Sequence, residues 1–195
     1  MKKIIRIVLP VSPAELSTAA QRILRWFFAY PNKDFTFNEL CKATGTSKTN
    51  AKVVVEELIR RGFIAKTVLG RLWRLVAHPQ SEKFRQMKIA ATFENVYASG
   101  IVELVRKKYP QARAIILFGS FRKGDDIVGS DIDIAVEVSG KQELVIESLG
   151  VIHWFGYRRD VMINIHIFSR QNVDINLFSN IANGIVLDGF LEVRP

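Results

Sequence analysis

Residues 114–138 decide the fold of the carboxy-terminal part of this chain, and they read AIILFGSFRKGDDIVGSDIDIAVEV. The run Ala114–Phe118 is apolar and rich in β-branched residues, so it predicts a buried strand that ends at Gly119. The pair Gly119-Ser120 then leaves the sheet. A turn of this kind lets backbone N–H groups and the Ser120 hydroxyl donate hydrogen bonds to a phosphate group. A glycine followed by a serine is weak evidence by itself.

The second half of this stretch adds two acids. Residues 130–136 predict a second buried strand, on which Asp131 and Asp133 are two positions apart and share one face. Two unpartnered carboxylates on an apolar strand repel each other unless a cation lies between them. Magnesium prefers oxygen ligands and is usually held by one or two carboxylates and substrate phosphates. The alternative is a pair of solvated acids at the end of a strand.

Taken together, residues 119–120, the spacer and residues 131–133 resemble the signature of the DNA polymerase β nucleotidyltransferase superfamily. The stretch that follows residue 120 is similar to the small-residue, arginine and glycine segment of its minimal members. The similarity is strong over residues 114–138. It extends weakly to residues 181–187, which look like the helix end and last strand of the same minimal fold.

The resemblance implies roles for five residues. Asp131 and Asp133 would be catalytic and would hold divalent metal, with Mg²⁺ as the expected cofactor, and the metal would clamp a nucleoside triphosphate. Gly119 and Ser120 would bind its phosphates. Lys123 stands where these proteins often have an arginine, so it joins the expected phosphate-binding residues.

The resemblance also implies a third carboxylate on a later strand, which helps to deprotonate the attacking hydroxyl group. The candidate strand Val161–Phe168 presents Asn164 and His166 on its polar face but no acid, and Asp160 lies just ahead of it. We expect Asn164 at the third catalytic position, facing the two aspartates. A neutral amide binds magnesium more weakly than a carboxylate and cannot act as a general base. His166 is either a substitute base or a structural histidine.

The amino-terminal part reads as three helices followed by a β-hairpin. After a short opening strand at residues 1–7, helices are expected from Pro13 to about Tyr30, over 37–44 and from 48 to about 61, with caps at Ser12, Thr36 and Ser47 and a capping-box Glu39. The apolar face of the third helix is expected to consist of Val53, Val54, Leu58 and Ile59. The hairpin arms are residues 63–68 and 71–76, with a turn at Leu69-Gly70. This order resembles the winged helix-turn-helix domains of bacterial and archaeal transcription regulators.

Charge separates the two parts of the chain. Residues 1–78 carry 14 Lys and Arg against five acids, whereas residues 79–195 carry 14 of each sign. A basic unit of this kind favours binding to a phosphate backbone, so DNA is the expected partner. The expected contacts are Ser47, Lys48, Thr49, Asn50 and Lys52 with base edges, and Arg71 and Arg74 on the wing with phosphates. The alternative is a protein-docking or dimerisation module.

Other features narrow the class of protein. A single cysteine, Cys41, excludes an intramolecular disulfide and a cysteine-cluster zinc site, and it fits the cytoplasm. The apolar runs are shorter than the roughly 18 residues of a membrane span, so no membrane association is expected. Residues 79–110 predict a helical linker with a break at Gly100.

We therefore expect a two-domain α/β (α+β) protein. Residues 1–78 would form the winged helix-turn-helix, 79–110 the helical linker, and 111–195 a nucleotidyltransferase-like mixed sheet flanked by helices. The expected function is the transfer of a nucleoside monophosphate from a nucleoside triphosphate to a hydroxyl acceptor with Mg²⁺. The alternative is a DNA-binding regulator whose nucleotidyltransferase domain binds nucleotide without catalysis. The sequence leaves a homodimer open and does not identify the acceptor.

Overall fold

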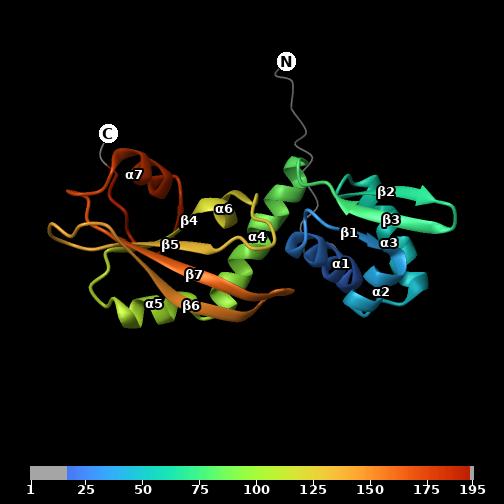
Figure 1. Ribbon diagram of the computed structural model, residues 1–195, viewed down its shortest axis with the longest axis horizontal. Helices are drawn as coiled ribbons and strands as arrows, with labels where there is room; N and C mark the ends of the chain where they lie inside the picture. Colours follow the sequence, from blue (N-terminus) through green and yellow to red (C-terminus); the bar gives the residue numbers. More distant parts are fainter. Residues whose placement is uncertain (1–16, 194–195) are drawn as a thin grey trace, which may run out of the picture.

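The computed structural model describes residues 17–193, and it shows two parts on either side of one long helix, α4 (Glu82–Ala98). Figure 1 shows the amino-terminal part at one end of an elongated molecule and a larger sheet at the other. The expected opening strand at residues 1–7 and the expected cap at Ser12-Pro13 lie outside the described residues.

The amino-terminal part has the element order of a winged helix. The elements are α1 (Thr18–Ala29), β1 (Asp34–Thr36), α2 (Phe37–Thr44), α3 (Lys48–Arg60), β2 (Ile64–Leu69) and β3 (Leu72–Ala77). The three strands form an antiparallel sheet in the order β1-β3-β2. Three helices and a hairpin are thus present, as the pattern of caps and apolar residues predicts.

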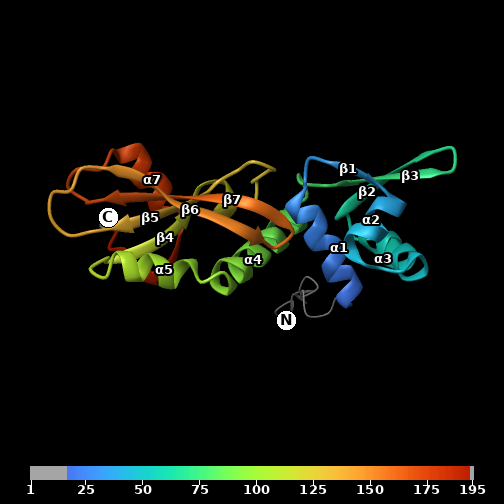
Figure 2. The same cartoon turned by 60° about the horizontal axis from the view of Figure 1, so that its bottom comes forward.

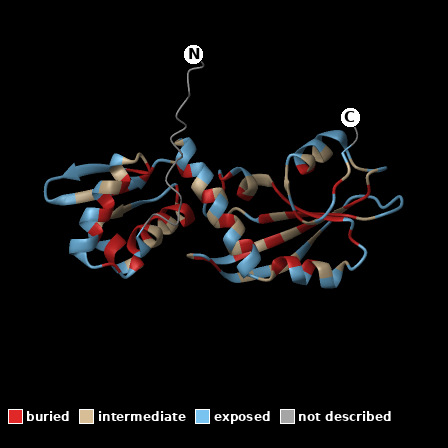
Figure 3. Ribbon diagram, turned by 180° about the vertical axis from the view of Figure 1, so that it is seen from behind, coloured by how far each residue is buried: buried red, intermediate tan, exposed pale blue. Residues whose placement is uncertain are grey.

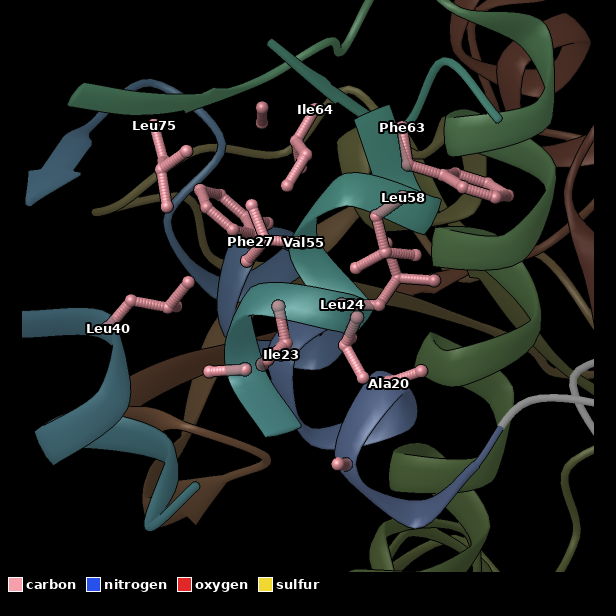
Figure 4. Close-up of a cluster of buried hydrophobic side chains, with 14 of the residues drawn as sticks. Ala20, Ile23, Leu24, Phe27, Leu40, Val55, Leu58, Phe63, Ile64 and Leu75 are labelled. Carbon is pink, nitrogen blue, oxygen red and sulfur yellow. The ribbon is translucent and has the colours of Figure 1, made fainter. Parts of the chain in front are cut away.

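One apolar cluster holds these elements together. Figure 4 shows Phe27 of α1, Leu58 of α3 and Leu75 of β3 pointing into a common core, and all three are fully buried. The caps set the helix starts. Thr36 and Glu39 form the predicted capping box on α2, and the Ser47 side chain accepts a hydrogen bond from the backbone N–H of Asn50 on α3.

Four local predictions in this part were wrong. Helix α1 begins at Thr18 with Ser17 as its cap, five residues later than expected. Strand β1 was not predicted, because three residues are too few to show a period. Leu69 pairs with Leu72, so the hairpin turns at Gly70-Arg71, one residue later than predicted, and Gly70 takes the positive φ of 61° that this turn needs. Val53 is 65% exposed rather than buried.

The carboxy-terminal part is a five-stranded mixed sheet covered by helices. After α4 and α5 (Ile101–Lys108), its elements are β4 (Ala114–Phe118), α6 (Gly119–Lys123), β5 (Ile132–Glu137), β6 (Val145–Phe155), β7 (Arg158–Phe168), α7 (Ile175–Ala182) and β8 (Ile185–Gly189). The strand order is β6-β7-β5-β4-β8. Strands β5 and β7 are parallel, and the other neighbours are antiparallel. The predicted class, a mixed sheet flanked by helices, is confirmed.

Each face of this sheet has its own core. Ile115 and Leu117 of β4 face α5 and the end of α4, whereas Ile116 faces α7. Figure 2 shows α5 and α7 on opposite sides of the sheet. Because both faces are covered, β4 is buried along its whole length, as Figure 3 shows by its colour. The ends of β4 and β5 are therefore held in place by a sheet that is packed on both faces.

The β6–β7 hairpin was only half predicted. Strand β6 was missed, because polar residues and Gly150 interrupt its apolar pattern. Strand β7 begins at Arg158 rather than at Val161, so the hairpin extends beyond the rest of the sheet towards α1 (Figure 1).

Candidate functional site

The expected catalytic residues come together where three central strands meet. Phe118 at the end of β4 pairs with Asp133 of β5, and Asp133 pairs with Asn164 of β7. Asp131 comes just before β5. The pairing of the strands alone therefore brings the glycine-serine turn, both aspartates and Asn164 to one edge of the sheet.

Gly119 lies directly against one of the carboxylates. Its φ is 73°, and a Cβ atom built on it would lie 2.7 Å from Oδ2 of Asp133. The backbone conformation favours glycine at this position, and a Cβ atom would press on the carboxylate of Asp133. The close approach leaves the backbone of the turn beside the acid, as a phosphate-binding turn next to a metal ligand needs.

Strand alternation correctly predicts which residues face the aspartates. The Asn164 amide Nδ2 donates to Oδ2 of Asp131 at 3.1 Å. His166 Nε2 lies 3.3 Å from Oδ1 of Asp133, and the imidazole ring stands edge-on to Phe118. Each carboxylate thus has a neighbour able to donate a hydrogen bond. The expectation that the two carboxylates are unpartnered was therefore wrong.

The other predicted site residues in the described part of the chain form no hydrogen bond or ion pair with the two aspartates. Ser120 is half-buried in the first turn of α6. Lys123 ends α6 with an exposed side chain, and within residues 17–193 it makes no ion pair with either aspartate. Asp160 is the third residue of β7 rather than ahead of the strand, and its Oδ1 contacts His153 Nδ1 at 2.7 Å.

A buried ionic cluster anchors the loop between the two halves of the motif. Asp126 is 1% exposed, and its carboxylate pairs with Lys88 of α4 (Nζ to Oδ1, 3.0 Å) and with Arg158 of β7. Burial lowers the pKa of the Lys88 ammonium group, and the negative charge of Asp126 opposes that change. None of these three residues was predicted from the sequence. The adjacent acids Asp125-Asp126 were the only local signal, and nothing pointed to their partners.

The same cluster joins the two parts of the molecule. The Arg158 guanidinium donates from Nε to the carbonyl oxygen of Ala29 at 2.9 Å and from Nη1 to that of Ile127 at 3.1 Å. The Tyr30 hydroxyl donates to the Tyr157 carbonyl at 2.8 Å. The carboxy-terminal end of α1 is therefore bonded to the β6–β7 turn directly, and to the motif loop through the side chain of Arg158.

The expected DNA-contacting residues share one exposed region of the amino-terminal part. Ser47, Lys48, Thr49, Asn50 and Lys52 are all exposed at the start of α3. Lys48, Thr49 and Lys52 line a hollow of about 580 Å³ next to Trp73 of β3, and Val53, which was expected in the core, lies there too. Arg71 is exposed in the hairpin turn, and Arg74 is paired with Asp34, which partly offsets its charge.

Within residues 17–193, no group of three or more His, Cys, Asp or Glu side chains is arranged to hold a metal ion. None of the helices in this range has the length and apolar character that a membrane span needs.

Comparison with known protein families agrees with the motif seen in the sequence. Residues 98–181 match the family model described as "Nucleotidyltransferase domain". The carboxy-terminal part of the chain therefore carries a nucleotidyltransferase domain, which confirms the resemblance seen in residues 114–138. None of the curated proteins matches the chain.

Two solved structures are similar to half of the chain. One is described as a transcriptional regulator, with 20% identity and a TM-score of 0.34 over 50% of this chain and 68% of that one. The other is the adhesin competence repressor of Streptococcus pyogenes, with 14% identity and a TM-score of 0.36 over 50% of this chain and 70% of that one.

Proposed function

We propose that this protein transfers a nucleoside monophosphate from a nucleoside triphosphate to a hydroxyl acceptor. The observation that carries the proposal is the packing of Asp133 against Gly119, next to Asp131, inside the segment that matches the nucleotidyltransferase family. A phosphate-binding turn and two acids at one edge of a rigid sheet are what a reaction by positioning and charge neutralisation requires.

The residues present fit a magnesium site. Two carboxylates, two positions apart, are enough protein ligands for Mg²⁺, because the ion completes its coordination shell with water and phosphate oxygens. Asp131 and Asp133 would hold it, and the bound ion would neutralise the charge of the phosphates. The backbone N–H groups after Gly119, with the Ser120 hydroxyl, would bind the β- and γ-phosphates. Lys123, which ends the same short helix, would add a positive charge to this phosphate site.

Charge-neutral variants of the two acids test the metal site. We expect Asp131→Asn and Asp133→Asn each to weaken magnesium-dependent binding of ATP or GTP at least about tenfold, because each removes an anionic ligand. Isothermal titration with and without Mg²⁺ measures this, followed by an assay for pyrophosphate release. Glu143→Gln is the matched control, since Glu143 is exposed and remote from the motif. Metal-independent affinity that is equal in all variants would contradict the site.

We further propose that the winged helix, residues 1–78, is a DNA-binding domain, that residues 79–110 link it to the catalytic domain at 111–195, and that α3 enters the major groove. Exposed Lys48 and Lys52 at the start of α3 support this, as does the charge surplus of the segment. Arg71 in the hairpin turn would contact phosphate.

The salt dependence of DNA binding tests this second proposal. We expect the full chain to bind duplex DNA with a steep dependence on salt, and Lys48→Ala with Lys52→Ala to flatten the slope by about one to two units. Lys107→Ala with Lys141→Ala removes the same charge from exposed sites elsewhere and should leave the slope unchanged. Anisotropy titrations at several salt concentrations give the slope. Absence of binding at low salt would rule out a DNA-binding domain.

A second candidate function rests on Asn164. This amide stands where the family resemblance implies a carboxylate, it is bonded to Asp131, and it cannot accept the proton of the attacking hydroxyl group. A regulator that binds nucleotide without turning it over is consistent with this arrangement. Nucleotide binding without pyrophosphate release would favour it.

A further inference from the structure

A groove of about 680 Å³ lies beside Asp131, between the two parts of the molecule. Trp26 of α1 and Tyr30, the residue that follows α1, line one wall, and Trp154 and Tyr157 of the β6–β7 hairpin line the other. Neither wall belongs to the nucleotidyltransferase motif, and the groove exists only because the hairpin extends beyond the sheet to α1. It is continuous with the site, since Asp131 is part of its lining.

The position of the groove identifies what it receives, on the assumption that the proposed transfer is correct. In the sheet, β5 lies between β4 and β7, so the phosphate-binding turn after β4 is on one side of the aspartates. The groove is on the other side, where Asp160, Val161 and Met162 of β7 line it. In phosphoryl transfer, the attacking and leaving oxygens are roughly in line. Pyrophosphate would leave on the β4 side, and the acceptor would therefore approach from the groove.

The walls of the groove have the chemistry of a nucleic-acid site. The Trp154 side chain is 54% exposed, and the guanidinium group of Arg159 lies 4.2 Å from its ring centroid. Trp26 and Tyr157 meet edge-on, with ring centroids 5.4 Å apart. Aromatic rings interleaved with arginine bind single strands, because every base has a π-face and every phosphate a negative charge. A duplex would hide these faces.

We propose that the groove binds the end of a single-stranded nucleic acid, the acceptor class of the transfer. In the reaction, the oxygen of the terminal hydroxyl forms a bond to the α-phosphorus of the triphosphate. The bond from that phosphorus to its β-bridging oxygen breaks, pyrophosphate leaves, and the hydroxyl proton passes to water. Trp154 and Tyr157 hold the last bases, and Arg159 contacts a phosphate between them.

Binding can be measured without metal or triphosphate, so that it does not depend on the proposed reaction. A short, fluorescently labelled single-stranded oligonucleotide is titrated with the full chain in the presence of a chelator. Trp154→Ala should weaken binding roughly tenfold, the usual size of one lost base-stacking contact. Val151→Ala is the matched control, because Val151 is similarly exposed on the same strand (51%) and is not part of the groove lining. It should bind as the wild type does.

Four outcomes are informative. Equal affinity of the Trp154→Ala variant and the wild type overturns the proposal. So does a loss of binding in Lys48→Ala with Lys52→Ala but not in Trp154→Ala, since α3 would then hold the strand. Trp154-dependent binding supports the groove. If the bound strand is not extended when Mg²⁺ and triphosphates are added, the proposed transfer fails while the binding site stands.

Discussion

Replacing Asp126 by alanine is expected to lower the free energy of unfolding by about 3–5 kcal/mol, the usual cost of removing one partner from a buried ion pair. The carboxylate is 1% exposed, and its partners Lys88 and Arg158 are 3% and 6% exposed. Without it, two cationic groups would remain buried with no anion beside them, although Arg158 would keep its bonds to backbone carbonyls. Urea unfolding followed by circular dichroism measures the change.

Asp125→Ala provides the matched control for this prediction. It removes the same charge one residue earlier, from an exposed side chain, so its effect should stay within about 0.5 kcal/mol. A loss of less than about 1 kcal/mol in Asp126→Ala would mean that the cluster is solvated or rearranges easily. The Asp126→Ala variant should also bind triphosphate more weakly, because the loop that Asp126 anchors leads directly to Asp131.

Local chemistry explains why so much of the motif could be predicted from sequence. A strand, a glycine and two acids two positions apart are encoded within residues 114–138, and strand alternation then predicts that Asn164 faces them. The helix caps at Thr36 and Ser47 are local in the same way. Such features depend on neighbours within a few residues, so they survive in any tertiary context.

The residues that were missed owe their roles to contacts between distant segments. Lys88, Asp126 and Arg158 come from three different elements, and no periodicity links them. The aromatic groove requires α1 and the β6–β7 hairpin to meet, which depends on the docking of the two parts. Trp154 and Tyr157 gave only a weak indication in the sequence, as aromatic residues in the short stretch HWFGYRR at 153–159. Burial in a core would have explained them equally well.

Replacing Asn164 by aspartate is expected to raise the rate of pyrophosphate release by roughly a hundred- to ten-thousandfold, the usual contribution of general-base catalysis. Asn164 lies across from Asp133 on the parallel strand, and its amide reaches Asp131. A carboxylate there would add a third acid to the pair and could accept the proton of the attacking hydroxyl group. The amide of the wild-type Asn164 can orient Asp131 through its hydrogen bond, but it cannot accept that proton.

The same substitution has an opposite effect on stability when metal is absent. Three carboxylates would then repel one another, and the hydrogen bond from the amide would be lost, so the melting temperature should fall. Magnesium should restore it, because a ligand that binds only the folded state stabilises that state. Asn164→Ala loses the same hydrogen bond without gaining a charge, so magnesium should not rescue it to the same degree.

Melting temperature and pyrophosphate release, both measured with and without Mg²⁺, therefore separate the two functions. A variant that magnesium stabilises and that turns over faster than the wild type would identify residue 164 as the third catalytic position of a weakened enzyme. A variant that is destabilised under all conditions and shows no gain in turnover would mean that no metal is held there. In that case the neutral amide is part of a binding site, and a regulator that binds nucleotide without turning it over is the better explanation of the protein.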